Sequence, residues 1–514
     1  MMIRKAYMKQ MLCIDTIKKN ISPVKRLFVF VAVVVVMNAC FLPVSTYAAA
    51  DSKGFVYDGY IYDHFGNVLE TPSAFQLERV IDENNMGGVP LKGINDVDCS
   101  ADGRIFLTDT LSGRVNVIDG DGNYITSIKA VKDKDGKMML DKDGKQVVLK
   151  APEGTFVHEK SNELYIADPE GAQIVVLDLT DYSYKRTLKK PANMTGSTQF
   201  KPSKVAVDDA DRVFAIVQSS YEGIIEMASD GSFIGYYGVN PPKVNLVAHF
   251  WKSIATDAQK EQMTKTFAPA FNNIAVDGEG FVMAVTYDHA AADMVFRLNS
   301  KGENVLREEG VSKVRGDLLT EGKTSEFVDI AVTDFGTYAL LDRTRGRVFI
   351  YDFDGNLLNV FGSLGDLKGE VKTPSGIAWL GDKLVVSDST LSCAYIYKPT
   401  KFGNEMLRAS DEYYNGNWDE ALDYFNKAVA LNANYEVAYS GIGKNYLMKD
   451  EFKKAMYYFK LGNNKVYYSK AYYGYRGEQL RKAFPLIAVV TVVLLVLLFG
   501  SEAGLFKRKK RSSQ

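Results

Sequence analysis

The sequence contains only four histidines that could act as a general base, and none of them lies in a catalytic motif. They are His64, His158, His249 and His289. A hydrolase would need such a base beside its substrate. The chain has no G-x-S-x-G, no H-E-x-x-H and no phosphate-binding loop. Its DGDG and DKDG stretches lack the remaining ligands of an EF-hand, so they are interpreted as turns. Motifs alone therefore predict no catalytic residue.

Polar residues do recur at one position of a phrase that occurs six times. The phrase is an apolar strand, a turn rich in Asp and Gly, a second apolar strand and usually an Asp. Its copies begin at Ile94, Glu153, Pro202, Phe271, Phe327 and Pro374. The position near the start of the first strand is occupied by Asp96, Thr155, Lys204, Asn273, Asp329 and Ser375 or Gly376. We expect these side chains to form one ring.

The elements that must position this ring are the four-stranded sheets of a β-propeller. Period-2 strands joined by Asp-Gly turns indicate hairpins, and a repeat of four such strands is typical of a propeller blade. The prediction is mainly β, with six blades over residues 51–400. An inserted hairpin is expected at 130–150 and an inserted helix at 244–267. The sixth copy ends after three strands, and segment 57–72 is expected to supply its missing outer strand.

The phrases resemble the NHL-repeat propellers and, more distantly, six-bladed lactonases of the SMP-30/gluconolactonase type. Residues Arg104–Asp109, Arg114–Ile118 and Arg347–Tyr351 carry this resemblance, which covers roughly residues 55–400. The lactonase resemblance implies that Asp96, Asn273 and Asp329 are oxygen ligands of Ca²⁺ or another divalent cation. Lys204 argues against a metal, because its ammonium could satisfy both aspartate charges. We otherwise expect no cofactor.

Two further sets of residues lie on the face of the ring. Asp residues that end the second strands are expected to accept backbone N–H groups at turns. These are Asp109, Asp168, Asp342 and Asp388, with Gln218 and Asp288 slightly out of register. The 244–267 insert carries His249, Phe250 and Trp251. It is either a lid over a sugar or peptide ligand or a helix packed flat on the blade rim.

Residues 401–482 have a helical period and resemble tetratricopeptide repeats. Trp418, Ala421, Phe425 and Ala428 recur 34 residues later as Phe452, Ala455, Phe459 and Gly462, which matches the spacing of that repeat. Two repeats are few for an independent unit. The helix over 469–482 is expected to cap them and to lead into a membrane span.

Both ends of the chain are predicted to contain membrane-targeting or membrane-spanning segments. Residues 1–50 are interpreted as a secretory leader, with a basic segment at Lys25 and Arg26, an apolar run and three alanines. Lipidation at Cys40 and an uncleaved anchor are the alternatives. Residues 484–506 are predicted to span the membrane, and the basic tail 507–514 is predicted to stay in the cytoplasm. The bulk of the chain is then extracytoplasmic.

Composition excludes some functions. The net charge of −1 gives no reason to expect nucleic acid as a partner. Cys99 and Cys393 form no disulfide framework. We expect a membrane-anchored binding or scaffold protein that recognises proteins, glycans or peptides through its propeller and helical repeats. Proteins of this resemblance often accompany carbohydrate-uptake systems, which makes a transporter a candidate partner. The alternative is a metal-dependent lactonase or related hydrolase.

Overall fold

The computed structural model describes residues 58–140, 144–194, 199–218, 220, 222–238, 269–288, 291, 293–308, 314, 316–317 and 324–502. Residues 56–514 form one compact unit, to which everything described below belongs. The predicted leader, the 244–267 insert with His249 and Trp251, and the basic tail lie outside the described residues.

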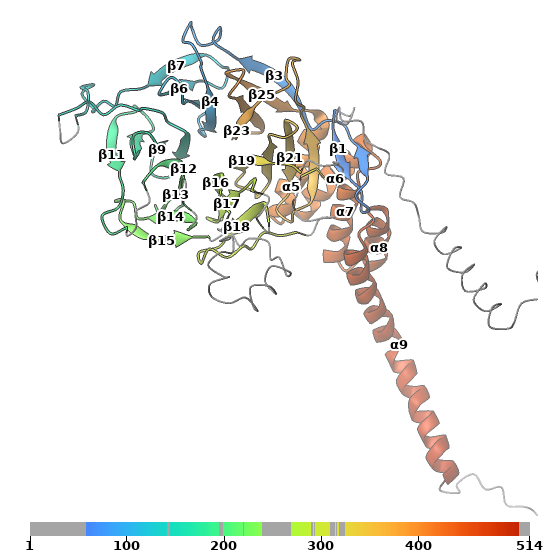
Figure 1. Cartoon of the computed structure of the whole chain (residues 1–514). Helices are drawn as coiled ribbons and strands as arrows, with labels where there is room; N and C mark the ends of the chain where they lie inside the picture. The colour runs from blue at the N-terminus through green and yellow to red at the C-terminus, as the bar shows by residue number, and fades with distance from the viewer. Residues whose placement is uncertain are drawn as a thin grey trace, which may run out of the picture. The chain divides into compact units, whose positions relative to one another are not determined.

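Six antiparallel sheets form a closed ring, which confirms the predicted propeller (Figure 1). Blade 1 is β4 (Ile94–Cys99), β5 (Ile105–Asp109), β6 (Arg114–Ile118) and β7 (Tyr124–Ile128), and blade 2 is β8 (Gly154–His158), β9 (Glu163–Asp168), β10 (Gln173–Asp178) and β11 (Tyr184–Leu188). Blade 3 is β12 (Pro202–Val207), β13 (Val213–Val217), β14 (Ile224–Met227) and β15 (Phe233–Tyr237), and blade 4 has β16 (Asn273–Val276), β17 (Val282–Val285) and β18 (Val295–Leu298) among its described residues. Blade 5 contains β19 (Phe327–Val332), β20 (Tyr338–Asp342), β21 (Arg347–Tyr351) and β22 (Leu357–Phe361), and blade 6 contains β23 (Pro374–Leu380), β24 (Lys383–Asp388), β25 (Cys393–Pro399) and β3 (Phe75–Ile81).

The second strands of several blades are buried along their whole length. Every residue of β5, β13 and β20 is buried. A strand covered on both faces by neighbouring layers has a continuous apolar sequence rather than an alternating one. Tight turns separate these strands, as where Asp352 accepts the N–H of Asn356 at 2.8 Å and Gly355 adopts a positive φ of 84°. Repetition of this unit buries the faces that one blade cannot bury alone.

The strand that closes the ring differs from the predicted one. Strand β3 pairs with β25, from Phe75 opposite Pro399 to Ile81 opposite Ala394. The predicted segment, 57–72, instead contains β1 (Tyr60–Tyr62) and β2 (Val68–Glu70), a hairpin appended to β22 of blade 5. The Asp63 carboxylate accepts the N–H groups of Phe65 and Asn67, both at 2.8 Å, so the segment folds back on itself.

The 130–150 insert also departs from a single hairpin. Its described residues form three extended segments joined by isolated β-bridges, with Lys132 opposite Met138 and Leu140 opposite Gln146. The first segment lies beside blade 2, because Lys132 forms a parallel bridge with Ser183 and its carbonyl accepts the N–H of Tyr184 at 2.8 Å. The two cysteines of the described residues, Cys99 and Cys393, are free thiols.

Helices follow the propeller without a linker. They are α5 (Lys401–Tyr414), α6 (Trp418–Leu431), α7 (Glu436–Met448), α8 (Phe452–Leu461) and α9 (Lys465–Glu502). Small residues let them approach, since a Cβ on Gly441 or Gly443 would lie 2.4 Å from the Phe425 ring or 2.6 Å from the Phe459 ring. The cap predicted over 469–482 is part of α9. The assignment of these helices as tetratricopeptide repeats stays a prediction.

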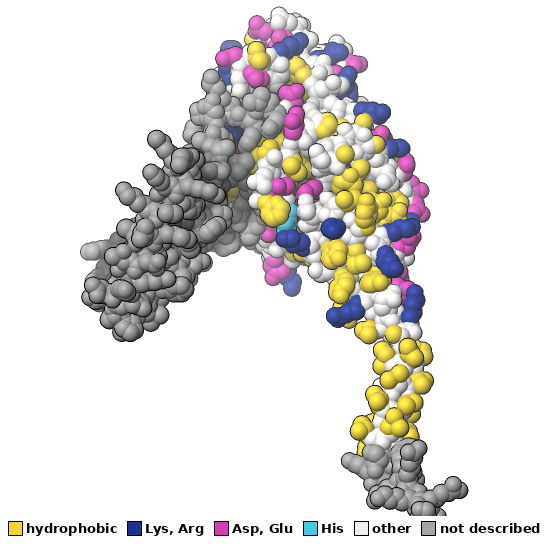
Figure 2. All heavy atoms as spheres, turned by 90° about the vertical axis from the view of Figure 1, so that its right-hand side faces the viewer, with side chains coloured by type: hydrophobic (Ala, Val, Ile, Leu, Met, Phe, Trp, Pro, Cys, Tyr) yellow, Lys and Arg dark blue, Asp and Glu magenta, His cyan; other side chains and the backbone are white. Residues whose placement is uncertain are grey.

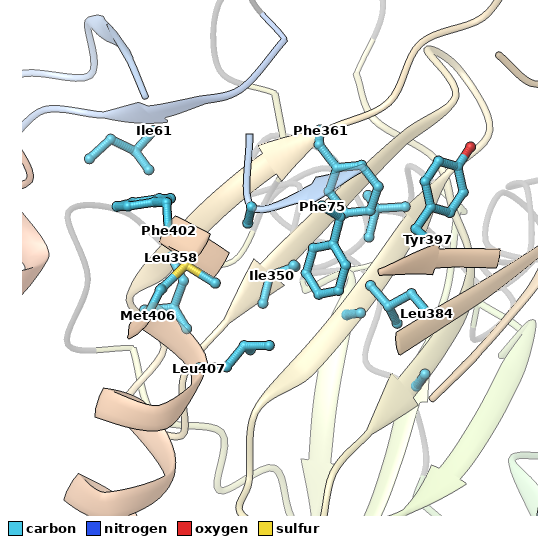
Figure 3. Packing of buried hydrophobic residues seen from close by; sticks show 14 of the residues in the cluster. Ile61, Phe75, Ile350, Leu358, Phe361, Leu384, Tyr397, Phe402, Met406 and Leu407 are labelled. Carbon is cyan, nitrogen blue, oxygen red and sulfur yellow. The ribbon is translucent and has the colours of Figure 1, made fainter. Parts of the chain in front are cut away.

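One hydrophobic core joins the first helices to the propeller. It contains Phe402 and Met406 of α5, Ile61 of β1 and Phe75 of β3, together with Phe361 of blade 5 (Figure 3). The Phe75 and Phe361 rings stack with centroids 5.1 Å apart. The Phe402 and Tyr435 rings pack edge to face, also at 5.1 Å. Blades 5 and 6 and helices α5, α6 and α7 therefore share buried side chains.

Helix α9 is the one helix among the described residues that is long and apolar enough to cross a membrane. Its apolar window has a mean hydropathy of 2.6, and none of that window is buried. The exposed side chains include Leu486, Val493 and Phe499. This agrees with the predicted span in length and composition.

Candidate functional site

The predicted ring brings Lys204 and Asp96 into direct contact. The Lys204 ammonium lies 2.6 Å from Asp96 Oδ1, and both side chains are buried. Lys204 belongs to blade 3 and Asp96 to blade 1, so the side chain crosses blade 2. It passes Gly154, where a Cβ would lie 3.0 Å from Lys204 Cδ and 2.6 Å from the Ser203 carbonyl oxygen. A residue with a side chain at position 154 would block this contact.

The other ring carboxylate, Asp329, is held by three donors. The Asn273 amide Nδ2 of blade 4 donates to Asp329 Oδ1, as does the backbone N–H of Ile330 at 2.7 Å. The N–H of Ile377 in blade 6 donates to Oδ2 at 2.6 Å. Asp96 behaves in the same way, since its Oδ2 accepts the N–H of Thr155 in blade 2 at 2.9 Å. These carboxylates satisfy inner-strand N–H groups that have no strand partner on the channel side.

Strand register places one predicted ring residue differently. Asp96, Lys204 and Asp329 each follow a register shift in their strand, whereas β8 has none. Gly154 therefore stands at the ring position of blade 2, and Thr155 lies one residue beyond it. A shift of one residue turns a strand side chain to the opposite face. Thr155 accordingly faces blade 1, where its hydroxyl lies 3.0 Å from that of Thr108. Gly376 occupies the position in blade 6, opposite Ser387.

Burial dominates the electrostatics of the ring. It raises the pKa of Asp96 and raises that of Asp329 well above its usual range, and the nearby Lys204 charge opposes both shifts. Burial also raises the pKa of Glu153, whose carboxylate accepts the Gln218 amide at 2.8 Å. The Lys204 ammonium thus supplies the positive charge that opposes the effect of burial on Asp96 and Asp329.

The ring as it stands does not fit a divalent cation. The Asn273 amide nitrogen is directed toward Asp329, and its oxygen accepts the N–H of Ile274 at 2.8 Å. Asp96 holds the Lys204 ammonium instead of offering a free oxygen. Among the described residues, no group of three or more His, Cys, Asp or Glu side chains is arranged to bind a metal.

The Asp residues that end the second strands lie at turns as predicted. Asp168 accepts the N–H groups of Lys150 and Ala151, both at 3.0 Å, and that of Gly171 at 3.2 Å. Asp342 accepts those of Glu326 and Thr344 at 2.9 and 2.8 Å. Asp109 and Asp388 bond their turns in the same manner. These residues connect the strands rather than face a ligand.

The half-buried Asp98 makes folding stability depend on pH. Burial raises its pKa to about 7, although its carboxylate accepts the N–H groups of Val157 at 2.7 Å and Cys99 at 2.8 Å. The native state then retains the proton over a range where the unfolded chain has lost it. Stability should fall as pH rises from about 4 to about 7. Asp98→Asn should reduce this fall, measured as Tm at pH 5 and pH 8.

The half-buried turn residue Asp119 supplies the control. Its hydrogen bonds with the side chain and backbone of Asn123 lower its pKa, so its linkage has the opposite sign. Asp119→Asn should leave the fall between pH 5 and pH 8 at least as large as in the wild type. A fall of unchanged size in Asp98→Asn would contradict the assignment.

A second candidate site is a hollow of about 820 Å³ between blades 4 and 5 and helices α5 and α6. We call it the junction hollow. Its walls carry five aromatic side chains and four charged ones. They are Phe281, Phe353, Tyr413, Tyr414, Trp418, Glu279, Arg297, Arg307 and Asp354. The volume lies in the range of small-ligand sites, which combine apolar walls with a few placed polar groups.

Asp354 holds the base of the junction hollow together. Its buried carboxylate accepts the Lys444 ammonium at 2.7 Å, Arg307 Nη1 at 3.0 Å and the Tyr413 hydroxyl at 3.1 Å. Burial raises the pKa of this carboxyl, but the Lys444 charge and these bonds outweigh burial and lower it. Propeller and helices are thereby joined by an ionised group.

Arginine and phenylalanine side chains alternate along one wall of the junction hollow. The Arg297 guanidinium carbon lies 3.8 Å from the Phe281 ring centroid and 5.1 Å from that of Phe353, and the Arg307 guanidinium carbon lies 4.2 Å from the Phe353 centroid. The Arg297 guanidinium forms ion pairs with the carboxylates of Asp277 and Glu279, both at 2.7 Å. Among the described residues, Arg307 forms an ion pair with Asp354 alone, and its side chain is 53% exposed. The exposed part of the guanidinium can donate hydrogen bonds to a ligand or stack on a ligand ring.

Sequence reasoning missed this hollow. Its residues come from the β16–β17 turn, from β18 and the segment after it, from a blade 5 turn and from two helices, and no repeated phrase marks them. The predicted His158 is buried, with Nδ1 2.6 Å from the Ser161 hydroxyl, and burial lowers its pKa. It lies in neither candidate site.

No protein-family model matches the sequence, and no curated protein is significantly similar to it. Several solved structures are similar in fold. Virginiamycin B lyase from Staphylococcus aureus is 13% identical, with a TM-score of 0.38 over 63% of this chain and 99% of that chain. The Cps50 (Swd1) β-propeller domain from Myceliophteria thermophila is 11% identical, with a TM-score of 0.38 over 63% and 100%. These similarities concern the fold alone. They assign no activity to this chain.

Proposed function

We propose that the protein is a membrane-anchored binding or scaffold protein whose propeller and helices recognise a partner through the junction hollow. The observation that carries this proposal is the continuity of α9. One helix packs on α8 at its start and ends as an exposed apolar segment suited to a bilayer. A recognition unit attached in this way acts at a membrane surface.

The two candidate sites differ in what they leave for a ligand. In the ring, Asp96 and Asp329 are buried and already bonded to protein groups. The junction hollow instead exposes much of Arg307 beside aromatic faces. This combination suits a partner that stacks a ring on an aromatic wall and offers an oxygen to the guanidinium, as glycans and peptides do.

The proposed location follows from the sequence at the two ends. We propose that the leader directs export, so that the propeller and helices lie outside the cytoplasm, and that the basic tail stays inside. A component of a carbohydrate transport system is then a candidate partner, by analogy with proteins of similar domain composition.

The test compares the full-length chain, purified from membranes, with variants of the junction hollow. Arg307→Gln and Trp418→Ala should each reduce the recovery of a specific protein or glycan by about tenfold, as expected for a recognition hot spot. The matched control is Arg343→Gln. Arg343 also lies over an aromatic ring, 4.2 Å from the Tyr287 centroid, and pairs with Glu326 at 2.6 Å, but it lies outside the hollow.

Two results would contradict the proposal. Equal recovery of the partner with all three variants would remove the junction hollow from recognition. Release of the wild-type protein from membranes by alkaline carbonate would show that α9 does not anchor it. The first result concerns the site and the second concerns the location, so the two failures can be told apart.

A further inference from the structure

Basic side chains gather on the part of α9 that precedes its apolar segment. Between Lys470 and Ala483 the sequence has four cations and one carboxylate, Glu478. Arg476 and Arg481 are exposed and have no ion-pair partner among the described residues. Lys482 pairs with Glu478 at 2.5 Å, which leaves the segment positively charged. Lys453 of α8 adds a fifth cation at the level of Tyr475, 5.5 Å from that ring.

The helix fixes the depth of these cations relative to a bilayer. The apolar run, which contains Thr491 as its one polar residue, covers residues 484–499. It is about 24 Å long at the rise of an α-helix, which is shorter than the hydrocarbon core of about 30 Å. The span must be completed downstream through Ser501 and Glu502 or upstream through Leu480. In the first case Arg481 and Lys482 lie just above the hydrocarbon boundary. In the second they extend back to it. Both place the two cations among lipid headgroups.

Exposed aromatic and apolar side chains accompany the cations. Tyr473 is 73% exposed and Leu480 is 54% exposed. They lie on one side of the helix with Arg476, at intervals of three and four residues. Figure 2 shows hydrophobic and basic side chains mixed on the helices directly above the apolar segment. Nothing in the described fold covers this face, whereas Ala471 and Gly474 on the other side pack toward α8.

We propose that Lys453, Lys470, Arg476, Arg481 and Lys482 form a basic collar that binds the phosphates of anionic lipids. The collar rests on the proposed membrane anchoring. Arginine forms paired hydrogen bonds with phosphate, and each cation near an anionic membrane surface contributes about 1 kcal/mol of attraction. Several such contacts on a single helix that is packed against α8 would fix the angle at which the body of the protein stands on the membrane.

The test uses the full-length protein in nanodiscs and spin-labelled lipids. The association of labelled phosphatidylglycerol with the protein is measured relative to labelled phosphatidylcholine. The collar variant is Arg476→Gln, Arg481→Gln and Lys482→Gln together. Its relative association constant for phosphatidylglycerol should fall at least about fivefold, the equivalent of one surface cation. All three residues are exposed, so the variant should fold.

The basic tail is the competing source of anionic-lipid binding, and a tail variant with Lys507 to Arg511 replaced by Gln controls for it. The collar predicts that the tail variant keeps a preference for phosphatidylglycerol that the combined collar and tail variant loses. A collar variant with wild-type preference would overturn the proposal, because all of the binding would then come from the tail. Failure of the wild type to enter nanodiscs would instead refute the anchoring.

Discussion

Lys204→Met should lower the free energy of unfolding by about 3–5 kcal/mol, because it breaks a buried ion pair from one side. The Lys204 ammonium lies 2.6 Å from Asp96, and its charge also acts on Asp329. Methionine fills a similar volume but leaves both carboxylates buried without that charge. Chemical denaturation of the purified protein, followed by circular dichroism, measures the loss. Lys449→Met is the control, since Lys449 pairs with Asp419 at the surface, where such pairs contribute less than about 1 kcal/mol.

The loss in Lys204→Met should depend on pH. Burial already raises the pKa of Asp96 and Asp329, and removal of the opposing charge raises both further. A carboxyl with a raised native pKa favours the native state at low pH, and this contribution disappears as pH rises through the native pKa. The deficit should therefore be smaller at pH 5 than at pH 8. A stability deficit that does not depend on pH would contradict the assigned role of Lys204. Stabilisation of the wild-type protein by added Ca²⁺ would also contradict it, because the ring would then hold a cation other than the ammonium.

Gly403→Ala should destabilise the protein by about 3 kcal/mol, although alanine is the better helix former. A Cβ at position 403 of α5 would lie 1.9 Å from the Ala74 carbonyl oxygen, just before the closing strand β3. The same oxygen accepts the N–H of Thr400 at 2.9 Å, and the Thr400 hydroxyl caps the helix at Gly403 N, 3.1 Å away. Backbone on both sides leaves no flexible atom to move aside. The same denaturation experiment measures the change.

Gly477→Ala is the matched substitution on α9. A Cβ at position 477 would meet no atom within 4 Å, so the variant should gain roughly 0.5–1 kcal/mol from helix propensity alone. The two variants make the same chemical change in helices and should move stability in opposite directions. If both raised stability, α5 would not be packed against the closing strand as described.

The sequence predicts those parts of the fold that depend on neighbouring residues. Asp168 and Asp342 were predicted to bond their turns because an Asp after a strand has backbone N–H groups within reach. Lys204 was predicted as a charge that could satisfy the ring aspartates, since a repeated phrase aligns it with Asp96 and Asp329. It contacts Asp96 directly, and Asp329 is bonded chiefly by Asn273 and backbone groups.

Features that depend on distant residues were not predictable in this way. The ring position of blade 2 was assigned one residue too late, to Thr155 instead of Gly154, because blade 2 lacks the register shift of blades 1, 3 and 5, which no composition reveals. Segment 57–72 was predicted to supply the closing strand, but β3 does so. The sequence offers two β segments before blade 1, and only pairing along the whole of β25 distinguishes them. The junction hollow requires two helices to meet two blades, and its residues share no period.

The position of β3 also sets the order in which the protein can be completed during synthesis. The strand is made first among the blades' strands, yet its partner β25 is made last. The ring therefore cannot close before residue 399 has left the ribosome, and such distant pairing is slow to form and exposes strand edges meanwhile. Thr400 and Gly403 meet Ala74 immediately afterwards. Contacts of the first turn of α5 thus stabilise the closed ring before the segment that would enter the membrane has been made.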